Sequence, residues 1–373
     1  DAPGAGAGIM GQVLSAPVTT KDSGNGLAPE KSLAWGFSSM QGWRISMEDA
    51  HLAVPQLEGE AWQGIALFSV MDGHGGEHVA HFCQKYLPEE IVKGSSQDVC
   101  GSLISAFHRM DEMLADPDRL EELRSLAHPS FLGNSKSWNA HPDWIGCTAV
   151  VCCVFPDKVV VANAGDSRAV LCRQGQAVPL SEDHKPNCPN EKKRINKAGG
   201  SIERQQFGSV VQFRVNGNLN LSRSIGDLEY KKNRNLPPNE QMICSTPDVQ
   251  VFPRQANDEF FVIACDGIWD VMGSQDVIDF VRERLPQDPM ARSHALQGIM
   301  EELLDNCVSP DLRKTGGLGG DNMTAMVVAF GEGPPNSGGI SGGANNDAIA
   351  RNLPAEHFAT MEEDAIVPVG LCG

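Results

Sequence analysis

Residues 68–76 read FSVMDGHGG, and the rest of the chain is organised around this stretch. Residues 65–71 form a continuous apolar run with one serine, which is typical of a strand buried on both faces. The run ends at Asp72, where a carboxylate and an imidazole lie among three glycines that let the backbone approach a ligand closely. A strand that ends in such a loop places Asp72 and His74 at a rim, where chemistry is commonly found.

Composition restricts the classes of protein to which the chain can belong. Its 373 residues are 41% hydrophobic, which is enough for a sizeable core, and carry a net charge of −18. The acidic balance argues against nucleic acid or an anionic membrane as the main partner. Eleven cysteines include no Cys-x-x-Cys pair, and several lie in apolar runs, which favours reduced core residues of a cytoplasmic protein. No apolar stretch approaches the roughly 20 residues that span a bilayer, and no secretory signal peptide is visible.

Three regions differ in composition. Residues 1–32 are rich in Gly, Ala, Pro, Ser and Thr, so we expect a flexible leader, of which residues 1–9 resemble an artificial linker. Residues 33–330 carry strand and helix patterns and are expected to form one domain. Residues 331–373 are rich in Gly, Asn and Ser and then acidic, and we expect an irregular tail.

Apolar periodicity predicts the elements of the domain. Expected strands are residues 32–40, 50–54, 65–71, 147–155, 159–164, 167–173, 248–252, 260–265 and 323–330. Expected helices are residues 77–93, 97–126 with a break at 116–117, 190–198, 274–285 and 290–307. The three runs in 147–173 suggest an antiparallel meander, and 207–232 looks like a polar flap. Helices grouped between runs of strands favour an α+β fold, with antiparallel sheets flanked by helices.

Acidic loops recur at the ends of the expected strands. They contain Glu48 and Asp49, Asp166, Asp266 and Asp270, and Asp321. If these loops converge with Asp72, they form a cluster of hard oxygen ligands, which suits Mg²⁺ or Mn²⁺ and not zinc. Like-charged carboxylates are plausible neighbours only with cations between them. Two ions about 3.5–4 Å apart would acidify a bridging water and hold phosphoryl oxygens for in-line attack.

A set of motifs then resembles a known family. The motifs are QGWRISMEDAH (41–51), DGHGG (72–76), AGDSR (164–168), DHKP (183–186), LSRSIGD (221–227), CDGIWD (265–270) and DNMT (321–324). In this order they resemble the metal-dependent serine/threonine protein phosphatases of the PPM family, protein phosphatase type 2C, and they cover about residues 33–330. Residues 236–243 are more similar to plant and protist members than to animal ones.

The resemblance implies a four-layer fold, in which a central antiparallel β-sandwich is flanked by α-helices on both faces and the metals lie at one end. It also implies hydrolysis of phosphoserine and phosphothreonine in proteins by direct attack of a metal-bridging water, without a phosphoenzyme. Residues 33–330 would then be the catalytic domain, and phosphoproteins the partners.

The resemblance also implies roles for individual residues. Asp72 would bridge two Mg²⁺ or Mn²⁺ ions with help from the Gly73 carbonyl, Asp266 and Asp321 would complete the first ion, Glu48 and Asp49 would hold the second and its waters, and Asp166 and Asp270 would form a weaker third site. Arg44 would bind the substrate phosphate as a planar fork. His74 would be the general acid for the leaving serine or threonine.

Several residues keep a second interpretation. His78 and His81 could imitate a metal cluster with His74 but are expected to be ordinary helix histidines. Residues 192–194 form either a docking patch or a solvated helix face. His184 makes either a structural hydrogen bond or a catalytic contact. Cys265 is either an oxidant sensor or an inert buried thiol.

Two other functions were weighed for the whole chain. A catalytically dead scaffold of this fold would lack a metal carboxylate, and none of those expected is missing. A different two-metal hydrolase such as a nuclease is disfavoured by the acidic composition and the lack of an aromatic and basic groove.

The start of the chain contains a candidate lipidation signal. Residues 10–15 read MGQVLS, which fits N-myristoylation of Gly11 if Met10 is the natural start. One myristoyl chain binds membranes only marginally, with a constant of roughly 10⁴ M⁻¹. We therefore expect weak membrane association of a largely cytoplasmic monomer. Residues 1–9 would block the Gly11 amine in the chain as it stands.

Overall fold

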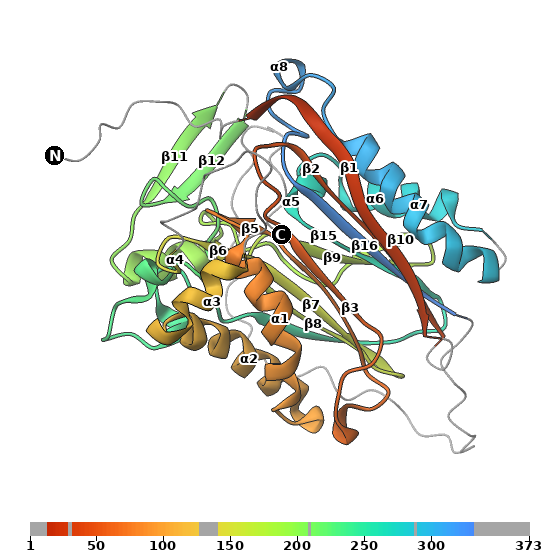
Figure 1. Cartoon of the computed structure of the whole chain (residues 1–373), viewed down its shortest axis with the longest axis horizontal. Coiled ribbons are helices and arrows are strands. Elements are labelled where there is room, and N and C mark those ends of the chain that lie inside the picture. The colour runs from red at the N-terminus through yellow and green to blue at the C-terminus, as the bar shows by residue number, and fades with distance from the viewer. Residues whose placement is uncertain (1–12, 29–31, 127–140, 208–209, 287–288, 332–373) are drawn as a thin grey trace, which may run out of the picture.

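The protein is described by a computed structural model that covers residues 13–28, 32–126, 141–207, 210–286 and 289–331. Two antiparallel sheets form its centre, and helices cover the outer face of each (Figure 1). The predicted α+β fold, a β-sandwich flanked by helices, is therefore confirmed.

The two large sheets contain eleven of the strands. The first has the order β1 (Val13–Ala28), β2 (Leu33–Arg44), β16 (Met323–Phe330), β15 (Asp258–Ala264), β9 (Arg168–Arg173) and β10 (Gln176–Pro179). The second has the order β14 (Asp248–Pro253), β8 (Lys158–Ala164), β7 (Ala149–Val154), β4 (Ala66–Met71) and β3 (Ala50–Val54). Two small sheets are β13 (Ile225–Gly226), β6 (Gly146–Cys147) and β5 (Gly73–His74), and the hairpin β11 (Ile202–Phe207) and β12 (Val210–Val215).

Helices form the outer layers. The described helices are α1 (His78–Val92), α2 (Val99–Leu114), α3 (Leu120–Ser125), α4 (Pro189–Lys197), α5 (Asp266–Trp269), α6 (Ser274–Arg284), α7 (Pro289–Cys307) and α8 (Leu312–Thr315). α1 and α2 pack on the five-stranded sheet, and α6 and α7 pack on the six-stranded sheet. The predicted break at 116–117 is confirmed, because Asp116 accepts a hydrogen bond from the Asp118 N–H and starts a short turn before α3.

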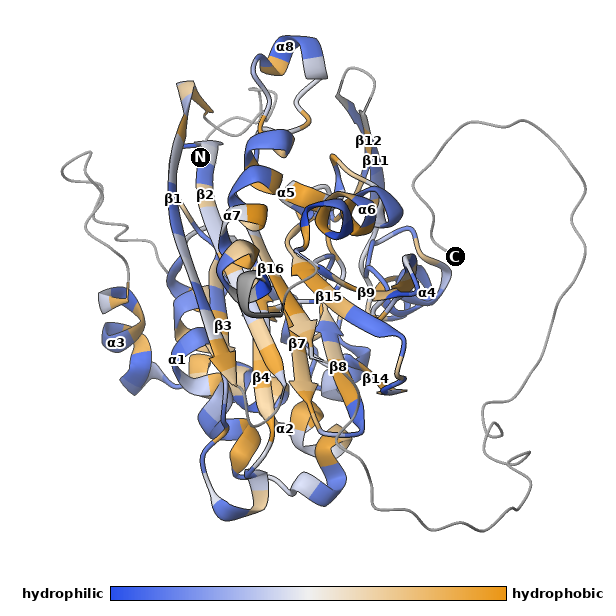
Figure 2. Ribbon diagram, turned by 90° about the vertical axis from the view of Figure 1, so that its right-hand side faces the viewer, coloured by the Kyte–Doolittle hydropathy of each residue, from blue (hydrophilic) through white to orange (hydrophobic). Residues whose placement is uncertain are grey.

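Successive side chains of the central strands face different cores. On β4, Leu67 packs in the core beneath α1 and α2, whereas Phe68 packs between the sheets. On β15, Phe260 faces α6 and α7, whereas Phe261 faces the inter-sheet core. Both faces of these strands are buried, which is why they appear in the sequence as continuous apolar runs. Figure 2 shows this hydrophobic centre, with hydrophilic residues along β1 at its edge.

The expectation of a flexible leader over residues 1–32 was wrong where the structure describes it. Val13–Ala28 forms β1, which pairs antiparallel with β2. A Cβ atom on Gly26 would lie 2.2 Å from the Trp35 ring, and one on Gly24 would lie 2.8 Å from the Phe37 ring. The glycines therefore let two aromatic rings of β2 lie across β1, and partner contacts outweigh a composition that favours disorder.

The expected meander was only partly right. β7 and β8 pair antiparallel, but β9 pairs with β15 and β10 in the other sheet. The chain crosses between the two sheets at residues 165–167, so Asp166 lies at the crossing. The segment 207–232, expected as an active-site flap, contains β12, whose partner strand β11 begins before it, at Ile202. The hairpin packs on α4 through a small core formed by Ile195 of α4, Val215 of β12 and Ile243.

Some predictions fall outside the described residues. These include Gly11, the linker-like residues 1–9 and the tail beyond Gly331. Among the helices that the structure does describe, none combines the length and apolar character needed to cross a membrane.

Candidate metal and catalytic centre

The metal candidates lie where the strands of the two sheets end. Asp266 follows β15, Asp321 precedes β16, and Arg44 ends β2. β16 pairs with both β15 and β2, so these three residues meet at one edge of the six-stranded sheet. Asp72 follows β4 in the other sheet. The sandwich therefore brings carboxylates from both sheets to a common end.

The pKa values of these carboxyl groups follow from the crowding. Burial is the largest cause that holds the pKa of Asp72 well above its ordinary value, and the charges of Asp49 and Asp266 raise it further. Burial likewise holds the pKa of Asp266 well above its ordinary value, and the charge of Asp166 adds to it. Raised pKa values mean that the ionised carboxylates are poorly solvated and repel one another. A cation bound between them would neutralise this repulsion.

Two metal candidates, Glu48 and Asp49, lie on the loop between β2 and β3, and Asp49 is the more deeply buried of the two. Its side chain is 6% exposed, and burial raises its pKa to about 7 although Thr324 donates a hydrogen bond to Oδ2 at 2.7 Å. Oδ1 has no hydrogen-bond partner among the described residues. Ligand atoms of Asp49, Asp72 and Cys265 all lie within 4.8 Å of one another. An unpaired buried oxygen in such a group fits a metal ligand.

Of the carboxylates predicted as metal ligands, Asp49 and Asp72 belong to this compact group. The charges of Asp266 and Asp321 raise the pKa of Asp72, but neither residue belongs to the group whose ligand atoms lie within 4.8 Å of one another. The third member of the group is Cys265, although the sequence predicted no sulfur ligand. Its thiol is fully buried, and burial holds its pKa well above the ordinary value, which favours the inert thiol over an oxidant sensor.

Close backbone packing fixes the loops of the centre. A Cβ atom on Gly73 would lie 2.2 Å from the Glu48 carbonyl oxygen, so only glycine fits there. Asn322 accepts a hydrogen bond from the Glu48 N–H at 2.9 Å and donates to the carbonyls of Gln41 and Ser46. Asn322 belongs to the DNMT motif, which by itself did not reveal these contacts. It joins the β16 loop to the loop that carries Glu48.

The two expected polar groups lie beside these carboxylates. Arg44 Nη2 lies 2.6 Å from Asp321 Oδ2. His74 Nε2 lies 2.7 Å from Asp227 Oδ2, and Ser224 donates a second hydrogen bond to that oxygen. Burial lowers the pKa of His74, but the charge and hydrogen bond of Asp227 outweigh it, so the net pKa is raised.

Asp227 is a residue of the site that the sequence did not reveal as a partner of His74. Its side chain is 1% exposed, and its backbone has a positive φ of 49° at the start of a short helical turn. A Cβ atom on Gly146 would lie 2.4 Å from its Oδ2 and 2.8 Å from His74 Nε2. The motif LSRSIGD contained the carboxylate, but its spatial neighbour is far away in the sequence.

Asp166 and Asp270 lie close enough to interact, and they share a lysine. Lys185 Nζ lies 2.5 Å from Asp166 Oδ2, and the charge of Asp270 also acts on this ammonium. Asp270 is exposed, whereas Asp166 is buried. Lys185 belongs to the DHKP motif, for which the sequence argument considered only the histidine.

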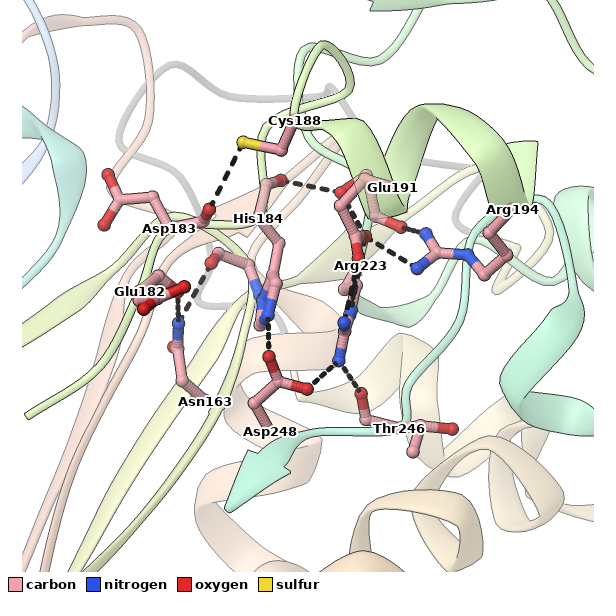
Figure 3. Close-up of polar contacts among 12 residues, drawn as sticks. Asn163, Glu182, Asp183, His184, Cys188, Glu191, Arg194, Arg223, Thr246 and Asp248 are labelled. Carbon is pink, nitrogen blue, oxygen red and sulfur yellow. Dashed lines mark hydrogen bonds and ion pairs between the residues drawn. The ribbon is translucent and has the colours of Figure 1, made fainter. Parts of the chain in front are cut away.

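His184 makes structural hydrogen bonds (Figure 3). Its Nδ1 accepts from the Gly165 N–H at 3.2 Å, and its Nε2 lies 3.0 Å from Asp248 Oδ2. Arg223 joins the other oxygen of Asp248 to Glu191 of α4. Of the two interpretations, the structure favours the structural one. Neither His78 nor His81 belongs to the candidate ligand group found among the described residues.

Comparison with known proteins now identifies the family. The family described as Protein phosphatase 2C matches residues 33–316. The chain belongs to this family. A probable protein phosphatase 2C of Oryza sativa subsp. japonica is 41% identical over 350 residues, which cover 86% of this chain and 91% of that protein. A protein phosphatase 2C homolog of Schizosaccharomyces pombe is 44% identical over 325 residues, covering 86% and 70%.

Solved structures support the same relationship. A phosphatase from a pathogenic strain of Toxoplasma gondii superimposes with a TM-score of 0.62 at 26% identity, covering 84% of this chain and 96% of that one. Proteins of the protein phosphatase 2C family are serine/threonine protein phosphatases. This chain is accordingly a metal-dependent serine/threonine protein phosphatase.

Proposed function

We propose that this phosphatase uses two Mg²⁺ or Mn²⁺ ions, held at the end of the β-sandwich, to hydrolyse phosphoserine and phosphothreonine in proteins. The observation that carries the proposal is the burial of mutually repelling carboxylates. Asp49, Asp72 and Asp266 all have raised pKa values, for which burial is the largest cause. Carboxylate oxygens are the preferred ligands of both ions.

The residues present fit such ions. Asp72 follows β4, Asp266 follows β15, Asp321 precedes β16, and Glu48 and Asp49 lie on the loop between β2 and β3. Asp49 Oδ1, without a partner among the described residues, and the close approach that Gly73 permits are the local features that support a ligand role. Asp166 and Asp270 are proposed as a weaker third site. When bound, the ions would acidify a water for direct attack on phosphorus, so that no phosphoenzyme forms.

Arg44 and His74 would handle the substrate. The Arg44 side chain is 47% exposed, so its guanidinium can turn from Asp321 toward a phosphate and bind two of its oxygens. His74 would donate a proton to the leaving oxygen of serine or threonine. The raised pKa keeps its imidazole protonated to higher pH, which a general acid requires.

Phosphate release tests this proposal. A phosphothreonine peptide should lose phosphate in the presence of Mn²⁺ or Mg²⁺, and the chelator EDTA should stop the reaction. Release that continues unchanged in EDTA would contradict the metal mechanism. Rapid quenching should recover no phosphorylated protein during turnover, whereas a trapped phosphoenzyme would refute direct attack by water.

The cellular setting is a separate proposal. We propose a largely cytoplasmic monomer that associates weakly with membranes through a myristoyl group on Gly11, if translation begins at Met10. The proposal is supported by the sequence MGQVLS alone. Mass spectrometry of the natural protein should find the added myristoyl mass on Gly11, and a free or acetylated glycine would refute it.

A further inference from the structure

One lysine side chain is directed into the acidic centre. Lys185 Nζ lies 2.5 Å from Asp166 Oδ2, and the Asp166 side chain is 2% exposed. Ionised carboxylates beside it favour the charged form of a lysine, whose ordinary pKa already keeps it protonated near neutral pH. The contact with Asp166 therefore places a cation beside the proposed metal ligands.

His184, the neighbour of Lys185, is hydrogen-bonded to Gly165, the neighbour of Asp166. His184 Nδ1 accepts a hydrogen bond from the Gly165 N–H, while its Nε2 lies 3.0 Å from Asp248 Oδ2. The His184 N–H also donates to the Gly165 carbonyl at 3.0 Å. The buried His184 thus holds in place both Lys185, which carries the ammonium, and Asp166, which carries the carboxylate.

Two further contacts hold the same loop. Asp183 receives a bidentate ion pair from Arg168 of β9, at 2.9 and 2.7 Å. The His184 carbonyl accepts hydrogen bonds from both the N–H and the hydroxyl of Ser222. A lysine usually extends its charged end into water. Here a loop anchored to β9 and to residue 222 delivers the ammonium to Asp166.

A divalent cation and this ammonium would compete for the same oxygens. An ion between Asp166 and Asp270 would need lone pairs of Asp166, one of which already accepts a hydrogen bond from the Lys185 ammonium. A divalent ion bound to Asp166 would also lie close to the Lys185 ammonium, and two cations so close in a partly buried site repel each other. A tighter third ion therefore requires the lysine to leave.

We propose that Lys185 is a built-in cation that takes the position of the third metal ion between Asp166 and Asp270, so that a divalent ion binds there only by displacing it. Lys185 is a positioning residue in this scheme, because it acts on Asp166 and not on the substrate. The inference rests on the proposed function only in taking Asp166 and Asp270 as metal ligands.

Metal binding tests the idea without turnover. Mn²⁺ should be titrated calorimetrically into the full chain and into Lys185→Met, which keeps the apolar stem and removes the charge. The weakest class of Mn²⁺ sites should bind at least tenfold more tightly in Lys185→Met, or should appear there if the parent binds no third ion. Unchanged or weaker binding would overturn the proposal, because it would make Lys185 a support for the site.

Matched variants exclude a general charge effect. Lys197→Met removes the same charge from α4, where Lys197 is 56% exposed and pairs with Glu240, and should change Mn²⁺ affinity less than twofold. Lys185→Arg retains the charge and should retain the weak class. Asp166→Asn combined with Lys185→Met should lose the tightened class, and its survival would also refute the proposal. Lys185→Gln provides a second neutral side chain if Lys185→Met does not fold.

The experiment is independent of the phosphatase assay. Failure of Mn²⁺ to support phosphate release would refute the proposed function, but the Mn²⁺ binding isotherms would still test the role of Lys185. Tight third-ion binding in the parent, unaffected by any substitution of Lys185, would refute this inference and leave the two-metal reaction standing.

Discussion

Arg44 Nη2 lies 2.6 Å from Asp321 Oδ2, so the proposed phosphate-binding group is paired with a proposed metal ligand. The two side chains are 47% and 35% exposed. Ion pairs at such exposure contribute little to stability and are easily exchanged. A metal ion on Asp321 and a phosphate on Arg44 would therefore replace one weak pair by two stronger interactions.

Replacement of Arg44 should mainly affect substrate binding. Arg44→Ala removes charge-assisted hydrogen bonds, and a net loss of about 1.5–3 kcal/mol corresponds to a roughly 10- to 150-fold rise in KM for a phosphothreonine peptide. The value of kcat should change less. Arg44→Lys should restore only part of the loss because an ammonium has no planar fork. Steady-state kinetics decide, and a fall in kcat at constant KM would contradict the role.

Asp266→Asn should abolish turnover and leave the fold intact. The pKa of Asp266 is raised in the folded state, so in the absence of metal its ionisation destabilises the fold, and this cost shrinks as pH falls below the folded pKa and is gone at the unfolded pKa. The metal-free variant should therefore unfold at the same or a higher temperature than the parent. It should also lose much of the stabilisation that Mn²⁺ gives the parent.

Thermal unfolding with Mn²⁺ and with EDTA measures both effects. Asp305→Asn is the matched control, because it removes an exposed carboxylate that pairs only with Lys21 among the contacts described. It should behave as the parent does. Near-normal Mn²⁺-dependent turnover in Asp266→Asn would remove Asp266 from the proposed ligands.

The sequence predicted the parts of this molecule that depend on local pattern. The buried strand before Asp72 and the acidic loops at strand ends are visible in a single chain because burial on two faces requires a continuous apolar run. β1 was missed because its stability comes from pairing with β2 and from the rings of Trp35 and Phe37 over its glycines. No local preference records such contacts.

The missed site residues share the same physical cause. Asp227 acquires its role from His74, which is 153 positions away in the sequence. Lys185 acquires its role because the chain crosses between the sheets at Asp166 and β9 pairs with β15. A motif shows which residue types are present, but partners brought together by sheet topology become visible only in the fold.

His74→Gln should lower kcat most for substrates with poor leaving groups. General acid catalysis typically contributes about 10²–10⁴-fold, so the loss on a phosphothreonine peptide should be roughly 100-fold or more. The loss on p-nitrophenyl phosphate should be much smaller, because its leaving group needs little protonation. Equal losses on both substrates would argue against His74 as the acid.

Asp227→Asn tests the same acid through pH. The Asp227 charge and hydrogen bond raise the pKa of His74, so their loss should lower it. An acid works only when protonated, and the alkaline limb of the kcat profile for the phosphopeptide should therefore move to lower pH. A limb that moves upward, or does not move, would separate Asp227 from the acid function.

Glu191→Gln should destabilise the protein in a pH-dependent manner, away from the metals. Glu191 is 3% exposed and contacts Arg194 at 2.6 Å and Arg223 at 2.8 Å. Burial alone would raise its pKa, but the hydrogen bond of Arg223 and the charge of Arg194 outweigh it and lower the pKa from 4.5 to about 2. The carboxylate therefore stabilises the fold fully above its unfolded pKa, and this contribution is lost as pH falls toward 2.

A depression of that size corresponds to roughly 3 kcal/mol, and leaving two largely buried guanidinium groups without the carboxylate has a cost of the same order. Urea unfolding should therefore show a difference of about 3 kcal/mol between parent and Glu191→Gln near neutral pH, shrinking as the pH is lowered below about 4.5. The exposed Glu240, which pairs with Lys197, provides the control: Glu240→Gln should cost less than about 1 kcal/mol at every pH. A difference for Glu191→Gln that stays constant down to acid pH would show that the side chain acts by packing and not through its charge.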